Sequence, residues 1–214
     1  MKLNGLKINF IGDSITEGCG VSSYEKRFTD IIQSQCGAIC RNYGLSGTRI
    51  ARQQVPSDIP QLDMYFESRL SGMENDADLV LVFGGTNDMG HGDAEIGCMT
   101  DRTPDTFYGA MHSLCISLIN KYPASTIVFM TPLHCWYENN PRGCGKAGLL
   151  IDYVNAIREV AQYYSLPVLD LYSVSGLQPA VPVIKELYVP DGLHPNDDGH
   201  KILADKILSF IRNL

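Results

Sequence analysis

The chain has 214 residues, of which 44% are hydrophobic and 19% are charged, which suits one sizeable core better than two full domains. A formal net charge of −7 without clustered Lys and Arg argues against nucleic acid as a partner, and no apolar run is long enough to span a membrane. We therefore expect a single domain over residues 1–214, cytoplasmic unless a leader precedes the amino end, where no signal-peptide pattern is present.

The first predicted strand, residues 6–11, stops at Gly12-Asp13-Ser14. Glycine permits a sharp bend, and ligands of open α/β sheets bind at the carboxyl ends of the strands. A helix that begins after such a strand directs free N–H groups and the positive end of its dipole at a developing anion. Ser14 is therefore a candidate nucleophile, although the same residue types are also common in ordinary turns.

The rest of the chain alternates between short apolar runs and residues at helical spacing. In chain order the predicted elements are helix 24–36, strand 38–43, helix 56–70, strand 78–83, helix 103–119 beginning at Thr103-Pro104, strand 125–130, helix 150–161, strand 167–171 and helix 202–214. Residues 89–102, 131–148 and 172–190 are predicted to be loops or irregular segments. This alternation calls for right-handed crossovers, so we predict a three-layer α/β/α sandwich with a mostly parallel five-stranded sheet.

Seven cysteines stand at irregular positions, and no two of them form a Cys-x-x-Cys pair. This pattern indicates neither a disulfide framework nor a zinc knuckle, and most of the seven are expected to be small buried residues. They are Cys19, Cys36, Cys40, Cys98, Cys115, Cys135 and Cys144.

Asp191 and His194 stand three residues apart, just before the last helix. If Gly192 allows one tight turn between them, the carboxylate reaches one imidazole nitrogen and leaves the other facing a cleft. That is the orienting half of a catalytic triad, because the acid sets the tautomer and the free nitrogen accepts the proton of a serine hydroxyl. A loop in which Asp191 only caps a turn is the alternative for this pair taken alone.

Ester hydrolysis through an acyl-enzyme also needs donors for the tetrahedral oxyanion. Gly47 lies in the turn after strand 38–43, and Asn87 follows strand 78–83. A parallel sheet gathers such strand ends along one edge. The Gly47 N–H, the Asn87 amide and the N–H of Ser14 are therefore the predicted oxyanion donors.

Four blocks of this sequence resemble the SGNH hydrolases, also called GDSL esterases and lipases. They are Gly12-Asp13-Ser14-Ile15-Thr16-Glu17-Gly18, Gly44-Leu45-Ser46-Gly47, Gly84-Gly85-Thr86-Asn87-Asp88 and Asp191-Gly192-Leu193-His194-Pro195, in the order of the family. Ile15 replaces the leucine of the family name. The resemblance implies a flavodoxin-like fold, hydrolysis without a metal or other cofactor, and the roles given above to Ser14, Gly47, Asn87, Asp191 and His194.

Two other classes of protein are weighed against this interpretation. A metal-dependent phosphoesterase would use acidic and histidine ligands, but it would need none of Ser14, Gly47 and Asn87. A non-catalytic binding module would leave a full set of catalytic groups idle. The candidate metal ligands would be Asp13, Asp88, Asp191, His194 and His200.

The expected partner is a small-molecule ester with a short acyl chain, and O-acetyl groups on carbohydrates are one candidate. A thioester or a lysophospholipid is the alternative for the same site. No amphipathic surface-seeking segment favours a lipid aggregate. Trp136 and Tyr137 could stack on a sugar ring or anchor a loop, and Met89 and His134 are further candidate substrate contacts.

Overall fold

The computed structural model describes residues 3–140 and 147–214, so Cys144 and the centre of the predicted 131–148 loop lie outside the described residues. Five parallel strands form one sheet, as the sequence predicts, and the structure shows their order to be β2-β1-β3-β4-β5. Their bounds are β1 Lys7–Gly12, β2 Ile39–Gly44, β3 Leu79–Phe83, β4 Thr126–Met130 and β5 Val168–Leu169.

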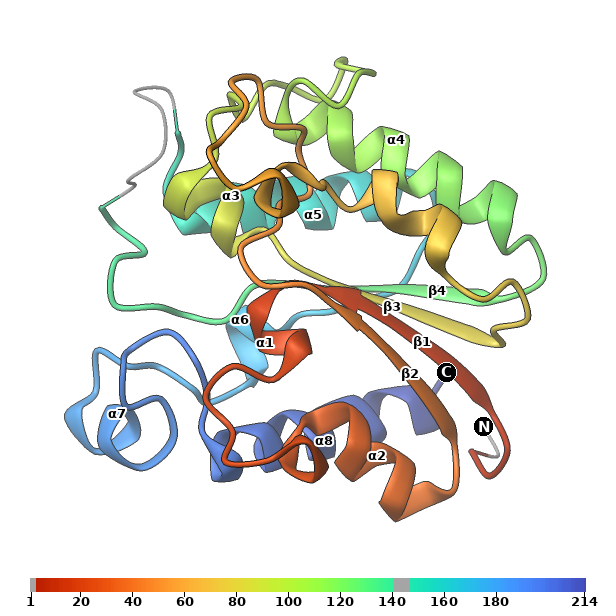
Figure 1. Ribbon diagram of the computed structural model, residues 1–214, viewed down its shortest axis with the longest axis vertical. Helices are drawn as coiled ribbons and strands as arrows, with labels where there is room; N and C mark the ends of the chain where they lie inside the picture. The colour runs from red at the N-terminus through yellow and green to blue at the C-terminus, as the bar shows by residue number, and fades with distance from the viewer. Residues whose placement is uncertain (1–2, 141–146) are drawn as a thin grey trace.

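Helices cover both faces of the sheet, which gives the three-layer α/β/α architecture (Figure 1). The α3, α4 and α5 helices lie on one side, and α1, α2, α6, α7 and α8 lie on the other (Figure 1). Their bounds are α1 Ser14–Glu17, α2 Phe28–Cys36, α3 Thr86–His91, α4 Phe107–Lys121, α5 Leu150–Tyr163, α6 Leu171–Val174, α7 Pro182–Tyr188 and α8 Asp197–Arg212, with 3-10 turns η1 Tyr24–Lys26, η2 Pro60–Asp63 and η3 Glu67–Gly72.

The β3 strand shows why the sheet needs cover on both faces. All five of its residues are buried, and their side chains alternate between the two layers of core. Val80 and Val82 belong to the cluster that packs under α4 and α5, whereas Leu79, Leu81 and Phe83 belong to the cluster under α2 and α8. A strand without a polar face is stable only between two helical layers.

The predicted helix over 56–70 is wrong, because the structure has only the short turns η2 and η3 there. Its apolar residues do not form one buried face, since Ile59 and Met64 are exposed. Local side-chain bonds also compete with helix formation: the Asp63 carboxylate accepts the Ser57 N–H, and the Ser57 hydroxyl donates to the Ile59 carbonyl.

Helix boundaries elsewhere also differ from the prediction. The α4 helix begins at Phe107 rather than Thr103, because Thr106 is the residue that caps it and accepts the Gly109 N–H. The segment 172–190 holds α7 and most of α6, and α8 begins at Asp197 with Asn196 as its cap. Short helices with few buried residues leave little periodic signal in a sequence.

The cysteines only partly follow the expectation of burial. Cys115 and Cys135 are buried, three others are half-buried and Cys98 is exposed. All six described cysteines are free thiols.

The carboxyl ends of β1, β2 and β3 are level with one another. Gly12 is in register with Gly44 on one side and with Phe83 on the other. A side chain at Gly44 would overlap the backbone of Thr16 and Glu17, so this glycine lets α1 lie directly on the end of β2. Three of the chain segments singled out by the sequence therefore start from one edge of the sheet.

Candidate active site

Ser14 lies at the first position of α1, immediately after β1. The Asp13 carboxylate caps this short helix by accepting the Ile15 N–H at 3.1 Å. The strand and the cap thereby hold the Ser14 side chain above the edge of the sheet. Its Oγ lies 3.0 Å from Nε2 of His194, which comes from a segment 180 residues further along the chain.

The turn between Asp191 and His194 has the tight geometry that its sequence suggests. Gly192 has φ +81°, which a residue with a side chain rarely adopts. Oδ2 of Asp191 lies 2.7 Å from Nδ1 of His194, and Oδ1 accepts the backbone N–H groups of Leu193 and His194 at 2.8 and 2.7 Å. Asp191 therefore caps the turn and orients the imidazole at the same time.

These contacts assign the protonation of the site. Partial burial opposes ionisation of Asp191, but the hydrogen bonds from the backbone and ring of His194 and from Leu193 outweigh it and hold the pKa of this carboxyl below its usual value. An ionised Asp191 accepts the Nδ1 proton of His194, which leaves the Nε2 lone pair for the hydroxyl proton of Ser14. Ser14, His194 and Asp191 thus form a continuous hydrogen-bonded chain.

Gly47, in the turn after β2, and Asn87, in α3, come from separate segments that meet at Thr48. Asn87 is buried in α3, and its Nδ2 donates one hydrogen to the carbonyl of Thr48 at 2.9 Å. Gly47, the residue before Thr48, has φ +76° and packs against Leu62. The amide of Asn87 has a second hydrogen that this contact does not use, as an oxyanion donor requires.

The residues proposed as substrate contacts occupy quite different environments. Met89 is fully buried in the core cluster under α4 and α5, so the expectation that it touches substrate is wrong. Tyr137 is also buried, at 9% exposure. His134 is held by Glu138, at 2.7 Å, and by the ring of Tyr172.

Trp136 is the exposed member of this group, with 52% of its surface accessible. The backbone N–H of Trp136 donates to the Gly192 carbonyl at 2.9 Å, and the indole leaves no room for a side chain at Gly192. The 131–140 segment therefore brings an aromatic plane against the turn that carries Asp191 and His194.

Two charged residues support the site through contacts that sequence reasoning missed. The guanidinium of Arg69 donates to the carbonyls of Gly12 and Tyr43, each at 2.9 Å, and so holds the ends of β1 and β2 together. Asp88, which the sequence analysis names as a candidate metal ligand, accepts the N–H groups of Ile50 and Ala51. Neither contact has a spacing or periodicity that a sequence could reveal.

Asp13 is almost fully buried, and burial raises the pKa of its carboxyl to about 6. Since an unfolded aspartate titrates near 3.8, the folded protein holds the Asp13 proton more tightly between about pH 4 and 6. The stability that protonation confers is therefore complete below about pH 4 and is lost as the pH rises through about 6.

We expect an Asp13→Asn variant, which keeps a capping oxygen, to gain stability relative to the parent as the pH rises from 4 to 7. Two pKa units correspond to about 3 kcal/mol in the free energy of unfolding. Urea denaturation of both proteins at several pH values measures this difference.

Asp197→Asn is the control with the opposite sign. Hydrogen bonds from the hydroxyl and amide of Ser22 lower the pKa of Asp197, so its contribution is present at neutral pH and is lost on acidification. Parallel pH curves for Asp13→Asn and the parent would contradict the burial effect at Asp13.

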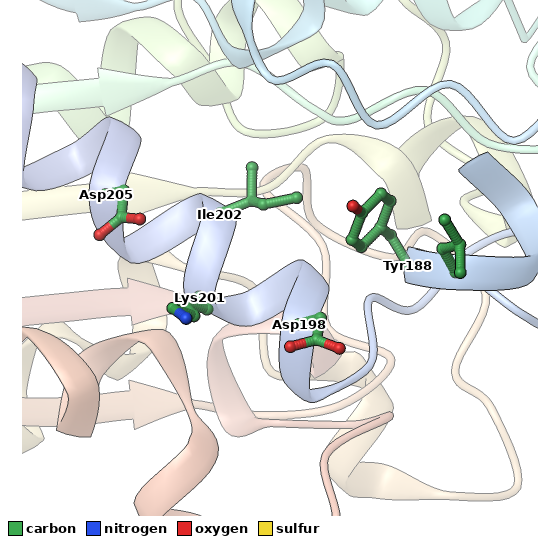
Figure 2. A pocket seen from close by; sticks show the side chains of 6 residues that line it. Tyr188, Asp198, Lys201, Ile202 and Asp205 are labelled. Atoms are coloured by element: carbon green, nitrogen blue, oxygen red, sulfur yellow. The ribbon is translucent and has the colours of Figure 1, made fainter. Parts of the chain in front are cut away.

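Other features of the described residues lie apart from the Ser14–His194 pair. A surface pocket of about 370 Å³ lies between α7 and α8, and Figure 2 shows the residues that line it, none of which belongs to the Ser14–His194–Asp191 chain.

His200, a candidate metal ligand, is buried and accepts the Phe28 N–H through Nδ1. Within residues 3–140 and 147–214 no group of three His, Cys, Asp or Glu side chains is placed to hold a metal ion. In the same ranges no helix combines the length and apolarity needed to cross a lipid bilayer.

A parallel α/β/α fold with a serine, histidine and aspartate at one sheet edge defines a class of serine hydrolases. Comparisons with known proteins place this chain within it. A sequence model of the GDSL-like Lipase/Acylhydrolase family matches residues 10–202, so the chain belongs to that family. It is a carboxylic ester hydrolase.

Individual relatives agree with this assignment. A curated GDSL lipase of Mycobacterium tuberculosis is 27% identical over 207 residues, which cover 94% of this chain and 79% of the relative. A solved structure from Lactobacillus plantarum is 29% identical, with a TM-score of 0.84 and coverage of 99% of this chain and 98% of that one. A lipase/acylhydrolase from Enterococcus faecalis, 21% identical over 97% and 96% of the two chains, shares the fold with a TM-score of 0.66.

Proposed function

We propose that the protein hydrolyses carboxylic esters of short acyl chains through an acyl-enzyme on Ser14, and that O-acetyl groups on carbohydrates are among its substrates. The observation that carries this proposal is the hydrogen-bonded chain from Ser14 Oγ through His194 to Asp191.

In the acylation step, Ser14 Oγ attacks the ester carbonyl while Nε2 of His194 takes the hydroxyl proton. Asp191 stays ionised and stabilises the imidazolium that forms. The N–H groups of Gly47 and Ser14 and the second amide hydrogen of Asn87 stabilise the negative oxygen of the tetrahedral intermediate. Collapse of this intermediate breaks the ester bond, and His194 returns the proton to the leaving alcohol.

Water completes the cycle by the same groups. It attacks the acyl-Ser14 carbonyl as His194 takes one of its protons, and the second tetrahedral intermediate uses the same three donors. Release of the carboxylic acid returns the proton to Ser14.

The surroundings of Ser14 favour a small acyl group. Polar and small side chains meet on one side of α1, where the hydroxyl of Ser46 contacts the Cys19 thiol and the Glu17 carboxylate. Leu62 fills the space next to Gly47. The exposed indole of Trp136, beside the Asp191–His194 turn, offers a flat surface for the alcohol part of the ester, and sugar rings stack well on such surfaces.

A series of esters tests the substrate class. We expect kcat/KM to fall as the acyl chain of p-nitrophenyl esters lengthens beyond a few carbons, and acetylated xylose to be hydrolysed faster than acetyl-CoA. We also expect Trp136→Ala to lower kcat/KM for acetylated xylose about 3- to 10-fold, the value of one aromatic contact, with little effect on ethyl acetate.

Ethyl acetate reports on the chemistry alone, so it separates lost stacking from a disturbed Asp191–His194 turn. Tyr163→Ala removes another exposed aromatic side chain, on α5, and serves as the matched variant. A preference for long acyl chains or acyl-CoA, or an equal loss on both acetyl esters in Trp136→Ala, would contradict the proposal for the substrate.

A further inference from the structure

Two of the three proposed oxyanion donors lie in segments that follow strands which are not neighbours in the sheet. Gly47 follows β2 and Asn87 follows β3, and the sheet order places β1 between these strands. No hydrogen bond joins β2 directly to β3, so the sheet sets the distance between the two donors only through β1. Contacts between the 47–51 loop and α3 join the two segments directly.

Asp88 makes the central contact of this kind. Its Oδ2 accepts the Ile50 N–H at 3.0 Å and its Oδ1 accepts the Ala51 N–H at 2.8 Å. Asp88 and the two donating residues, Ile50 and Ala51, are buried, at 3%, 1% and 2% exposure. Water has no access to replace either bond, so both N–H groups depend on this one side chain.

Other hydrogen bonds also join α3 to the 47–51 loop. Asn87 donates to the Thr48 carbonyl, and the Arg49 guanidinium donates to Nδ1 of His91 at 2.9 Å. Arg49 also donates to the carbonyl of Leu62, the residue that packs on Gly47. Residues 87, 88 and 91 of α3 thus all form hydrogen bonds with residues 48–51.

We propose that Asp88 is a positioning residue for the reaction: by binding the Ile50 and Ala51 amides it fixes the Gly47 N–H relative to the Asn87 amide. This proposal rests on the assignment of Gly47 and Asn87 as oxyanion donors. Asp88 itself touches neither the substrate nor the reacting atoms.

The physical reason for an aspartate here is the number of acceptors. A carboxylate offers an oxygen to each of the two N–H groups, whereas an asparagine offers one oxygen and turns an NH2 group toward the other N–H. Asp88→Asn therefore leaves one buried N–H unpaired and releases one end of the loop. The Gly47 donor then moves out of line, which weakens stabilisation of the transition state more than binding of the ester.

The structure supplies a matched control in the same loop. Asp93 accepts the N–H groups of Gln54 and Val55 at 2.8 and 2.7 Å, so it makes the same paired contact a few residues further on. That contact is exposed and follows Gly92, beyond the end of α3. Asp93→Asn removes one of a similar pair of bonds without touching the contact between Asp88 and residues 50–51.

The test measures p-nitrophenyl acetate hydrolysis and the affinity for phenylboronic acid, which forms a tetrahedral adduct with a reactive serine. We expect Asp88→Asn to lower kcat about 10- to 100-fold, to leave KM within about threefold, and to weaken the boronic acid by a factor similar to that for kcat. Asp93→Asn should leave all three within about twofold of the parent. Rates are taken per active site titrated from the acyl-enzyme burst, so unfolded molecules do not count.

An unchanged kcat in Asp88→Asn, a loss confined to KM, or an equal loss in Asp93→Asn would overturn the proposal. If Asp88→Asn fails to fold, Asp88→Glu is measured, and the same joint loss of kcat and boronic acid affinity is expected. If neither variant folds, Asp88 is required for folding, and this result also overturns the proposal. Asn87→Ala tests the oxyanion assignment on which the proposal rests. If Asn87→Ala keeps the rate of the parent, the oxyanion assignment is wrong. If Asn87→Ala loses rate but Asp88→Asn does not, the positioning role of Asp88 is wrong.

Discussion

Ser14→Ala should reduce kcat for p-nitrophenyl acetate about 10⁴- to 10⁶-fold and abolish labelling by a fluorophosphonate probe. The reason is that no other hydroxyl replaces Oγ at 3.0 Å from Nε2 of His194 within the hydrogen-bonded chain. The fold should be intact, because the substitution removes one partly exposed hydrogen bond, and the melting temperature should stay within about 4 °C of the parent.

Ser46→Ala is the matched control for this experiment. The hydroxyl of Ser46 is near α1, but it contacts Glu17 and Cys19 rather than His194. We expect this variant to keep fluorophosphonate labelling. Labelling that survives in Ser14→Ala would mean that another residue is the nucleophile.

His194→Ala is expected to cost about 10⁴- to 10⁶-fold in kcat as well, because the Ser14 hydroxyl then has no base to take its proton. The combined Ser14→Ala, His194→Ala variant should be little slower than either single variant, since the two residues act as one unit. Hydrolysis rates of the parent, both single variants and the double variant measure this non-additivity.

Two further observations distinguish a lost base from a damaged fold. The rise of kcat/KM with pH that deprotonation of the base produces in the parent should be absent from His194→Ala. Added imidazole should restore part of the rate, because it can occupy the space beside Ser14. Multiplicative losses in the double variant, or an unaltered pH profile in His194→Ala, would count against this role.

The strands were predictable because a parallel sheet buries both faces of its inner strands. Short apolar runs such as 78–83 therefore stand out from the surrounding polar sequence, and all five predicted runs contain the observed strands or differ from them by one residue. Helices α5 and α8 were predictable in their centres for a related reason: each has one continuous buried face.

The irregular parts were not predictable, because side-chain contacts rather than periodicity determine them. The residues over 56–70 have helical spacing, yet bonds such as Ser57 to Asp63 favour turns. Thr103 and Thr106 are both plausible caps, and only tertiary packing selects Thr106.

The candidate site also has a part that the sequence could predict and a part that it could not. A glycine, an aspartate and a histidine close together in sequence predict a tight Asp191–His194 turn, since the contact is local. The hydrogen bonds from residues 50–51 to Asp88 join positions almost 40 residues apart, so no local pattern in the sequence could predict them. Met89 was predicted to contact the substrate, although its side chain belongs to the buried core cluster under α4 and α5.

The central claim, that the acyl group of the ester passes through Ser14, is tested most directly by locating that group during turnover. Acid quenching of a reaction with p-nitrophenyl acetate, followed by proteolysis and mass spectrometry, should find one acetyl group on the peptide that contains Ser14, formed at the rate of the initial burst and absent from Ser14→Ala. An acetyl group on another residue that forms and decays at the catalytic rate would contradict the account.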